Sequence, residues 1–294
     1  MNTYLFGGSG FLGPVILEKY PEIVSVGRTS PPDYVNNRHI QVDNLDDLSV
    51  LDDEPIDNVI FLIGCSDHHY LNNTVVEGLN KNVYPLKQAL SYFSKRKLNK
   101  FICFTTTLLY DKLLMKQPVK ETEPLNPYIN EYVFSKFLSE QIVSFYKQDV
   151  PTIIIRCSNI YGPTKLIRPD LVPTLIQNLL SSDDVSVWNK SPIRDFIYLE
   201  DAADVLMKLL QSPYTGPVNL ATGESTSVGN ICDILENLSG KKIADKNIKV
   251  TGPMLFHCDT SLLKQLTNWE PAHTIEQGLT KTYNRMKQWS ECAS

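Results

Sequence analysis

Long apolar runs are missing from this sequence of 294 residues, which contains no stretch of about 18 apolar residues that could cross a bilayer as a helix. The N-terminus leads from Thr3–Phe6 straight into glycine, so we expect no secretory leader. Excess positive charge is also missing: the net charge is -5, which argues against a nucleic-acid-binding surface, since such a surface normally shows clustered Lys and Arg. We therefore expect a cytoplasmic protein whose partners include neither a membrane nor a nucleic acid.

Closely spaced cysteines are absent as well. The six cysteines are scattered without any Cys-x-x-Cys spacing, so neither a zinc site nor a disulfide framework is indicated, and we expect no metal. Several lie in apolar runs, as Cys103 does, where a small buried side chain is the expected role. What is present is 42% hydrophobic residues, which is enough for one large core or two modest ones.

Short apolar segments alternate with longer amphipathic ones through the first half of the chain. Six apolar segments are predicted as strands: Thr3–Phe6, Ile23–Val26, His39–Val42, Asn58–Leu62, Lys100–Phe104 and Thr152–Arg156. Three amphipathic segments are predicted as helices: Gly10–Lys19, Glu77–Arg96 and Asn130–Lys147. Strands that are apolar throughout and separated by helices indicate a parallel sheet covered on both faces. The predicted fold class is therefore α/β, with a Rossmann-like doubly wound sheet.

The pattern becomes less regular after residue 163, and the second half is predicted to be a smaller, mixed α/β domain. The segments expected here are a helix opened by Arg168–Pro173, helices at Ala202–Leu210 and Ser227–Leu238, and a strand at Pro217–Ala221. We expect residues 1–163 to form a dinucleotide-binding domain, to which residues 194–221 return. Residues 164–294 are expected to form mainly a substrate-binding domain.

Glycines are concentrated between the first strand and the first helix. Three of them follow a Gly-x-x-Gly-x-x-Gly spacing, and the turn reads Gly7-Gly-Ser-Gly10-Phe11-Leu12-Gly13. Glycines let backbone N–H groups approach a pyrophosphate closely, and the N-terminus of the following helix favours the negative charge. A tight turn without a ligand is the alternative. Because the turn follows an N-terminal strand, we predict a dinucleotide site formed by Gly7, Gly10, Phe11, Leu12 and Gly13.

The residues after the second strand indicate which dinucleotide is bound. An Asp or Glu at that position grips the adenosine ribose hydroxyls of NAD and excludes a 2′-phosphate. Here the strand is followed by Gly27 and Arg28, then by Thr29 and Ser30, and Arg28 can pair with a phosphate. The pattern favours NADP over NAD, which stays possible, since Arg28 is equally compatible with a solvated loop.

Tyr132 and Lys136 are separated by one helical turn, which places a phenol and an ammonium group on one face. A phenol titrates near pH ~10, and a fixed cation beside it lowers that pKa toward neutrality. Three hydroxyl residues, Thr105, Thr106 and Thr107, lie upstream. The spacing alone fits any amphipathic helix, whereas its combination with the glycine turn and the threonines predicts an acid–base site.

The ordered motifs resemble those of the extended short-chain dehydrogenase/reductases, in particular the nucleotide-sugar epimerase, dehydratase and reductase family. The resemblance runs from the glycine turn almost to the C-terminus. Besides that turn and the Tyr132 and Lys136 pair, its motifs are Asn82-Val83, Arg156-Cys-Ser-Asn159-Ile-Tyr-Gly-Pro163, Arg194-Asp-Phe-Ile-Tyr198 and Trp269-Glu-Pro271.

The resemblance implies a catalytic role for three residues. Tyr132 would donate or accept a proton at a sugar hydroxyl or ketone, Lys136 would lower its pKa and hold the nicotinamide ribose, and Thr106 would hydrogen-bond the substrate oxygen. When hydride reaches a carbonyl carbon, negative charge develops on the oxygen, and a phenol together with a hydroxyl donor stabilises and protonates it.

The resemblance also implies binding roles outside that trio. Asp43 falls where the family contacts adenine, and Asn82 is assigned to the cofactor-binding residues. Asn159 and Arg194 fall where the family binds its nucleotide-diphosphate sugar substrate. The family's late phosphate-binding arginine is missing, and His257, in the segment Phe256–Asp259, is only a weak substitute.

The residues after Thr106 narrow the choice of reaction. The family's 4,6-dehydratases carry an Asp-Glu pair where this chain has Thr107-Leu108. Members that combine 3,5-epimerisation with reduction carry a Cys at the position of Leu108. Both reactions are therefore disfavoured.

Three hypotheses for the function remain. The favoured one is an NADPH-dependent reductase of a 4-keto-6-deoxy nucleotide sugar, in the biosynthesis of deoxysugar or polysaccharide precursors, because it needs an exchangeable cofactor, which suits Arg28. The second is a nucleotide-sugar C4 epimerase with tightly bound NAD. The third is a non-catalytic NADP-sensing or regulatory subunit, although such relatives usually lose the Tyr, the Lys or the hydroxyl residue.

Family members usually form dimers through two helices, which here are Glu77–Arg96 and Asn130–Lys147. Phe134, Phe137 and Leu138 give the second of these helices enough apolar surface for both the core and a partner. We therefore expect a homodimer.

Overall fold

The structure is a computed structural model that describes residues 1–71, 74–166, 168–250 and 252–293. The chain divides into two compact units, which are described separately. The first unit comprises residues 1–110, 125–157 and 203–218, and the second comprises residues 111–124, 158–202 and 219–294. The assignment of cofactor binding and substrate binding to separate domains stays a prediction.

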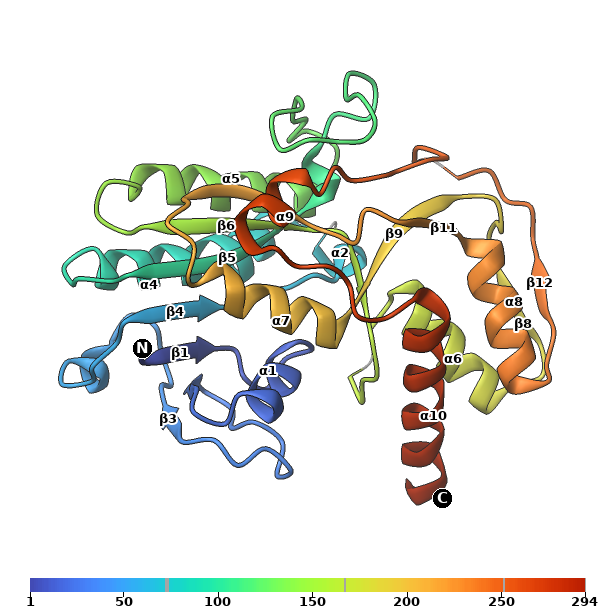
Figure 1. The fold of residues 1–294 in the computed structure, drawn as a ribbon, viewed down its shortest axis with the longest axis horizontal. Coiled ribbons are helices and arrows are strands. Elements are labelled where there is room, and N and C mark those ends of the chain that lie inside the picture. The colour runs from blue at the N-terminus through green and yellow to red at the C-terminus, as the bar shows by residue number, and fades with distance from the viewer. Residues whose placement is uncertain (72–73, 167, 251, 294) are drawn as a thin grey trace. The chain divides into compact units, whose positions relative to one another are not determined.

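A seven-stranded sheet forms the centre of the first unit, with the strand order β10-β6-β5-β4-β1-β2-β3 (Figure 1). Its strands are β1 (Thr3–Phe6), β2 (Val24–Gly27), β3 (His39–Gln41), β4 (Asn58–Phe61), β5 (Lys100–Thr106), β6 (Thr152–Cys157) and β10 (Gly216–Leu220). The pairs from β3 across to β6 are all parallel. The predicted strands and the Rossmann-like α/β fold are therefore confirmed, and only the strand ends shift.

Both faces of this sheet are covered, as the uninterrupted apolar runs require. Every residue of β1 and of β4 is buried. The rings of Phe6, Phe61, Phe93 and Phe101 contact one another, with centroids 5.8 to 6.1 Å apart. This aromatic cluster packs a helix against the centre of the sheet and so gives the ends of the strands a rigid support.

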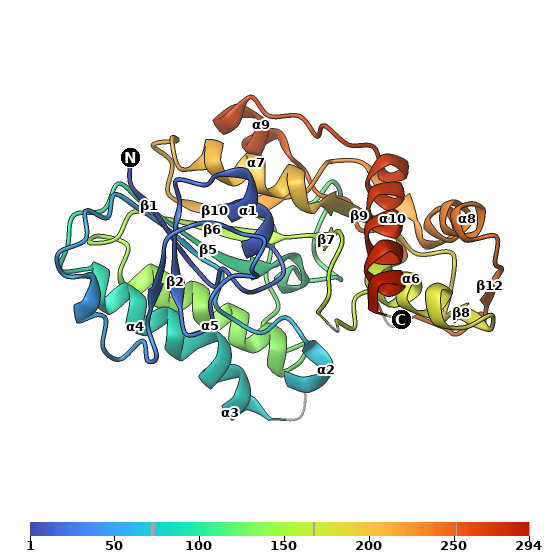
Figure 2. The same ribbon diagram turned by 90° about the horizontal axis from the view of Figure 1, so that it is seen from below.

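Helices cover the two faces of the sheet in the manner of a doubly wound fold. Figure 2 shows α4 (Tyr84–Phe93) and α5 (Glu131–Phe145) side by side on one face. Helix α1 (Gly13–Lys19) lies on the other face with the C-terminal part of α7 (Leu199–Leu209). Asp204 of α7 accepts a hydrogen bond from Tyr20 at 2.7 Å and pairs with Lys19 at 2.6 Å.

The prediction of one uninterrupted α-helix over Glu77–Arg96 is wrong, because a π-helical turn interrupts it. Three helical segments follow one another there: α3 (Val75–Gly78), a π-helical turn η2 (Leu79–Val83) and then α4. Pro85 has no N–H group and cannot close an α-helical hydrogen bond with the residue four positions earlier. This explains the wider turn immediately before it. Asn82, one of the predicted site residues, lies in that turn.

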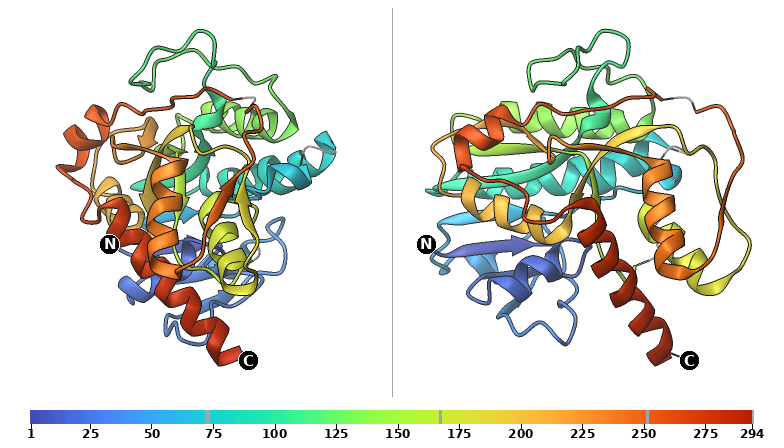
Figure 3. Two further views of the ribbon diagram at one scale, coloured as in Figure 1. Left: turned by 90° about the vertical axis from the view of Figure 1, so that its right-hand side faces the viewer. Right: turned by 45° about the vertical axis from the view of Figure 1, so that its right-hand side comes forward.

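Among its described residues, the second unit contains two small sheets and four helices, besides the first residues of α7. One sheet has the order β11-β9-β7 and the other pairs β12 with β8. The strands are β7 (Asn159–Tyr161), β8 (Val185–Val187), β9 (Ile193–Tyr198), β11 (Ser225–Ser227) and β12 (Ile243–Asp245). The helices are α6 (Leu171–Ser181), α8 (Val228–Ser239), α9 (Ser261–Thr267) and α10 (Ile275–Ala293). Figure 3 shows α10, in red, beside α8, in orange.

The prediction of a mixed α/β second half is confirmed, but most of its strands were not predicted. Four of the five are only three residues long, too short to show a periodic pattern. The remaining elements are a short helix α2 (His68–Leu71) and 3-10 turns at Ser49–Leu51 and Thr107–Leu109. Among the described residues, no helix combines the length and the apolar character needed to span a membrane.

Candidate active site

The glycine turn after β1 is closed so tightly that two of its glycines cannot be replaced without strain. Gly7 has φ +91°, a conformation that favours glycine, and its carbonyl oxygen accepts a hydrogen bond from the N–H of Gly10 at 3.1 Å. A Cβ on Gly13 would lie 2.6 Å from that same carbonyl oxygen. The turn therefore presents only backbone atoms at this point, which is the surface that pyrophosphate binding requires.

Helix α1 begins at Gly13 rather than at the predicted Gly10, because the turn occupies the residues in between. Leu12 is the residue before the helix and is buried, whereas Phe11 is half-buried. Pro14 stands at the start of the helix, where its missing N–H costs no intrahelical hydrogen bond. The residues predicted to bind the cofactor here thus form one continuous turn.

Arg28 and Asp43 lie at the carboxyl ends of the adjacent strands β2 and β3, and both are exposed. The side-chain amide of Gln41 links them, since Nε2 donates to the carbonyl oxygen of Arg28 at 2.9 Å and to Oδ1 of Asp43 at 2.6 Å. The hydrogen bond from Gln41 therefore fixes the backbone of Arg28, from which its guanidinium group extends. No acidic residue takes its place at the end of β2.

Tyr132 and Lys136 lie in the first turns of α5, on its buried side. Asn130 caps the helix, because its Oδ1 accepts a hydrogen bond from the N–H of Val133 at 2.9 Å. The ammonium nitrogen of Lys136 is 5.9 Å from the centroid of the Tyr132 ring. The one-turn spacing read from the sequence thus places phenol and cation beside one another.

The surroundings of Lys136 are largely apolar. Burial lowers its pKa from the ordinary value of 10.5 to about 8. Its Nζ lies 3.4 Å from the carbonyl oxygen of Phe104, near the end of β5. A Cβ on Gly64 would be 3.4 Å from the same nitrogen, so the chain after β4 passes close to it. The lysine is therefore held between the ends of two central strands.

Asn82 connects the chain after β4 to α5. Its Oδ1 accepts from the backbone N–H of Cys65 at 2.7 Å, and its Nδ2 donates to Oγ of Ser135 at 2.9 Å. Oγ of Ser135 donates in turn to the carbonyl oxygen of Tyr132 at 2.8 Å. Asn82 therefore positions both the chain near Lys136 and the backbone of Tyr132.

The three consecutive threonines at the end of β5 have different surroundings. Oγ1 of Thr105 donates to Oε1 of Glu140 at 2.9 Å, and Oγ1 of Thr107 donates to a backbone carbonyl of β6 at 3.3 Å. Oγ1 of Thr106 accepts from the N–H of Leu108 at 3.2 Å, which does not use its own proton. Of the three hydroxyl groups, that of Thr106 is therefore the one that keeps its proton for donation to another group.

Two polar residues of α5 that sequence reasoning missed support this site. Ser135 makes the bonds described above, and Glu140 forms a buried ion pair with Arg156 of β6. A sequence signal did exist for Glu140, because it follows Lys136 by one helical turn on a helix face that is otherwise small or apolar. A carboxylate at such a position requires a buried cation elsewhere in the chain.

The two remaining predicted residues lie in the second unit. Asn159 is an exposed residue of β7, and its Nδ2 donates to the carbonyl oxygen of Asp195 on β9 at 2.9 Å. Arg194 of β9 is half-buried, and its Nη1 donates to the carbonyl oxygens of Ile193 at 2.8 Å and Met254 at 3.3 Å. Backbone carbonyls therefore hold both side chains: one on the neighbouring strand for Asn159, and for Arg194 one on its own strand and one in the segment near residue 254.

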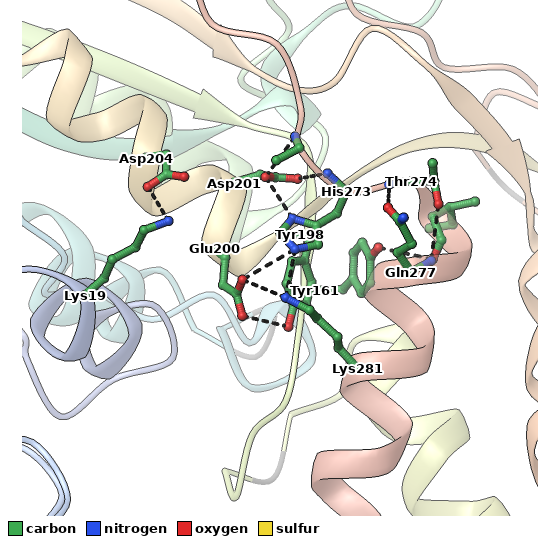
Figure 4. Close-up of polar contacts among 12 residues, drawn as sticks. Lys19, Tyr161, Tyr198, Glu200, Asp201, Asp204, His273, Thr274, Gln277 and Lys281 are labelled. Atoms are coloured by element: carbon green, nitrogen blue, oxygen red, sulfur yellow. Dashed lines mark hydrogen bonds and ion pairs between the residues drawn. The ribbon is translucent and has the colours of Figure 1, made fainter.

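A further polar cluster in the second unit contains none of the predicted residues (Figure 4). Nδ1 of His273 lies 3.0 Å from Oδ1 of the buried Asp201, and its Nε2 lies 2.9 Å from Nζ of Lys281. Lys281 also donates to Glu200 at 3.0 Å. Because an ammonium group can only donate, Nδ1 of His273 carries the proton toward Asp201. The cluster joins the start of α7 to the segment that leads into α10.

Within the described part of the chain, no group of three or more His, Cys, Asp and Glu side chains is arranged to hold a metal ion.

Comparison with known proteins identifies relatives of this chain. Residues 3–223 match the model of the NAD dependent epimerase/dehydratase family. The chain is 28% identical over 207 residues to an uncharacterized UDP-glucose epimerase, YtcB, of Bacillus subtilis (strain 168), which covers 68% of this chain and 64% of that protein. It is also 28% identical over 225 residues to dTDP-glucose 4,6-dehydratase 1 of Escherichia coli (strain K12), covering 67% and 62%. The chain thus spans somewhat less than two thirds of these relatives.

Solved structures share the fold over almost the full length. The crystal structure of UDP-glucose 4-epimerase from Thermotoga maritima with UDP-glucose has a TM-score of 0.88, and the match covers 99% of this chain and 100% of that one. The sequences are 20% identical, so this likeness shows the fold alone.

Proposed function

Since the chain belongs to the NAD dependent epimerase/dehydratase family, we propose that it is an NADPH-dependent reductase of a 4-keto-6-deoxy nucleotide sugar. The family itself covers epimerases and dehydratases of nucleotide sugars, so the choice of reaction rests on this chain's own residues. The observation that favours the NADPH-dependent reductase is the exposed Arg28 at the end of β2. An acidic residue at this position would favour NAD.

Three residues of the first unit would perform the proton chemistry. The bound nicotinamide would supply the hydride. Tyr132 would protonate the developing alkoxide, and the adjacent Lys136 cation would stabilise the tyrosinate that remains. The hydroxyl of Thr106 would donate a second hydrogen bond to the same oxygen. Asn82 would act indirectly, by positioning the backbone of Tyr132 through Ser135.

The cofactor-binding residues proposed for the first unit fit a dinucleotide. The turn from Gly7 to Gly13, including Phe11 and Leu12, would hold the pyrophosphate at its backbone N–H groups, because a side chain at Gly13 would meet backbone atoms. Arg28, followed by Thr29 and Ser30, would pair with the 2′-phosphate of NADP. Asp43, at the end of the neighbouring strand, would contact the adenine. In the second unit, Asn159 and Arg194 would bind the sugar and its diphosphate.

Dehydration is the family reaction that these residues support least. It needs a second acid–base pair, and the positions after Thr106 hold Thr107, whose hydroxyl is bonded to a backbone carbonyl, and the apolar Leu108. Neither can exchange protons with a substrate carbon and its hydroxyl group.

A C4 epimerase is the second candidate, because relatives such as the Bacillus subtilis protein are named as UDP-glucose epimerases. The same Tyr132 and Lys136 would serve it, since an epimerase removes and returns a proton at one hydroxyl group. It would retain NAD in place of exchanging NADPH. Arg28 gives it less support than it gives the reductase.

Turnover measurements with the purified chain separate the candidates. With NADPH and a panel of UDP-, dTDP-, GDP- and CDP-linked 4-keto-6-deoxyhexoses, the reductase would oxidise one NADPH for each sugar reduced. Interconversion of C4 epimers with no net change in NADPH would favour the epimerase. NADP binding without turnover of any nucleotide sugar would point to the non-catalytic alternative.

We also propose a homodimer formed through α4 and α5. Tyr84 at the start of α4 and Phe145 at the end of α5 are exposed, and Phe134, Phe137 and Leu138 are only half-buried. A second copy would remove this apolar surface from water. A monomeric mass in solution at micromolar concentration would contradict the dimer.

A further inference from the structure

Two half-buried cations lie beside the same glycine in the second unit. Lys112 comes from residues 111–124, and Arg194 comes from β9. A Cβ built on Gly252 would lie 3.6 Å from Nη2 of Arg194 and 4.0 Å from Nζ of Lys112. Two positive groups separated by long stretches of sequence therefore flank one point of the backbone.

No carboxylate neutralises these cations within the described residues. Nη1 of Arg194 contacts neutral carbonyl oxygens of Ile193 and Met254, and neither Arg194 nor Lys112 forms an ion pair there. Asp195 follows Arg194 on the strand, but alternate side chains of a strand point to opposite faces. Its carboxylate accepts instead from the N–H groups of Thr222 at 2.9 Å and Gly223 at 2.8 Å.

His257 does not join the pair either. Its Nδ1 lies 2.8 Å from Oγ of Ser225, which is the register partner of Asp195 on the neighbouring strand. His257 thus belongs to the Asp195 side of β9, and Arg194 lies on the other side.

Six other cationic side chains of the second unit have acidic partners, which provides a comparison. The paired ones are Lys190 and Lys242 with Glu236, Lys241 with Asp183, Lys264 with Glu270, Lys281 with Glu200, and Arg168 with Asp170. Lys190 resembles Lys112 in being half-buried, and it is paired with Glu236 at 3.1 Å.

Removing two like charges from water without a counterion is unfavourable. Burial lowers the pKa of Lys112, and the charge of Arg194 lowers it further. Burial also lowers the pKa of Arg194. An anion that brings negative charge to both groups lowers this free-energy cost. A diphosphate can do so with one phosphoryl group for each cation.

We propose that Lys112 binds the diphosphate group of the nucleotide-sugar substrate together with Arg194. The identity of the substrate rests on the proposed function, whereas the anion site rests on the two unpaired cations alone. Arg194 would contribute a planar set of donors and Lys112 a compact charge. The sequence predicted a role for Arg194 and gave no indication of Lys112.

Inorganic pyrophosphate is the probe that tests this assignment without depending on turnover. Its binding to the full chain would be measured by calorimetry with saturating NADP, which keeps pyrophosphate out of the glycine turn. Lys112→Met and Arg194→Met should each weaken binding by about tenfold, the effect of losing one charge-assisted hydrogen bond. Lys116→Met is the matched control, since it removes an exposed lysine of the same segment and should leave binding unchanged.

The stability of the ligand-free variants distinguishes a binding role from a structural one. Lys112→Met relieves the repulsion with Arg194, so its melting temperature should be equal to or above that of the wild type. A residue that only supported the fold would lower it. Weaker pyrophosphate binding combined with undiminished stability is therefore the expected signature.

A tethered carboxylate gives a second, independent test. Gly252→Asp would place a negative charge between the two cations, where the Cβ makes only ordinary contacts. It should raise the melting temperature and abolish pyrophosphate binding, whereas the neutral Gly252→Asn should do neither.

Wild-type pyrophosphate affinity in Lys112→Met or in Gly252→Asp would overturn the assignment. Failure of the proposed function looks different: pyrophosphate would still bind in a Lys112-dependent manner, while no 4-keto sugar would be reduced.

Discussion

The carboxylate of Glu140 and the guanidinium of Arg156 form a two-point ion pair, with Nε to Oε1 at 3.0 Å and Nη2 to Oε2 at 2.8 Å. Both side chains are almost fully buried, at 7% and 5% exposure. Thr105 donates to the same carboxylate at 2.9 Å. Because Glu140 lies one helical turn beyond Lys136, the pair fixes the helix that carries Tyr132 and Lys136 against β5 and β6.

Neutralising Glu140 should therefore destabilise the protein strongly. Glu140→Gln leaves Arg156 buried without its counterion, and we expect the free energy of unfolding to fall by about 3 to 5 kcal/mol in urea titrations. Glu18→Gln is the matched control, because it makes the same change at an exposed position and should alter stability by less than about 0.5 kcal/mol. Equal stability of the two variants would contradict this role of the ion pair.

Lys136 should make the stability of the cofactor-free protein depend on pH. Burial lowers its pKa from 10.5 to about 8, so between these values the unfolded chain binds more protons than the folded one. Stability from this group is fully present above pH 10.5 and is lost as pH falls through 8, by about 3 kcal/mol in total.

Lys136→Met removes this titration and provides the measurement. At neutral pH the variant avoids burying a charge and gains stability relative to the wild type. That advantage should shrink by roughly 3 kcal/mol toward pH 10, when unfolding is followed in denaturant at each pH. A difference between the two proteins that did not change with pH would show that Lys136 is not desolvated.

The glycine turn allows a graded test of cofactor binding. Gly13→Ala would place a Cβ 2.6 Å from the carbonyl oxygen of Gly7, and backbone atoms cannot move away easily. We expect NADPH affinity to fall by about tenfold or more, measured by fluorescence titration. Gly10→Ala brings its Cβ only to 3.3 Å from the same oxygen and should cost less. Wild-type affinity in Gly13→Ala would count against a dinucleotide at this turn.

Arg28 should determine the choice between the two nicotinamide cofactors. Arg28→Ala removes the proposed partner of the 2′-phosphate, and hydrogen bonds between charged groups contribute about 1.5 to 3 kcal/mol. The Kd for NADPH should therefore rise by roughly 10- to 100-fold, and the Kd for NADH should stay the same. A parallel loss of both cofactors would mean that Arg28 supports the turn itself and does not select NADP.

The central sheet could be predicted from sequence because its signals are local. The apolar runs of β1, β4 and β5 and the glycine turn at Gly7–Gly13 each report on a few adjacent residues. Even the spacing of Tyr132 and Lys136 is local, since one helical turn determines it. These elements were placed correctly, with shifts only at their ends.

The features that escaped prediction depend on residues far apart in the chain. Arg156 and Glu140 belong to different elements, and nothing near Lys112 in sequence points to Arg194. The π-helical turn that carries Asn82 follows from one proline inside an otherwise helical pattern, which periodicity alone does not reveal. Long-range pairing and local backbone adjustments of this kind are decided by tertiary packing.

The most direct test of the proposed reaction is a single-turnover measurement with Tyr132→Phe. Loss of nicotinamide absorbance would be followed after mixing NADPH-saturated protein with the 4-keto nucleotide sugar that the wild type reduces. We expect a rate about 10²- to 10⁴-fold lower than that of the wild type, with NADPH affinity preserved, because only the proton donor is lost. An unchanged rate would contradict the assignment of Tyr132 as the acid and with it the proposed function of this site.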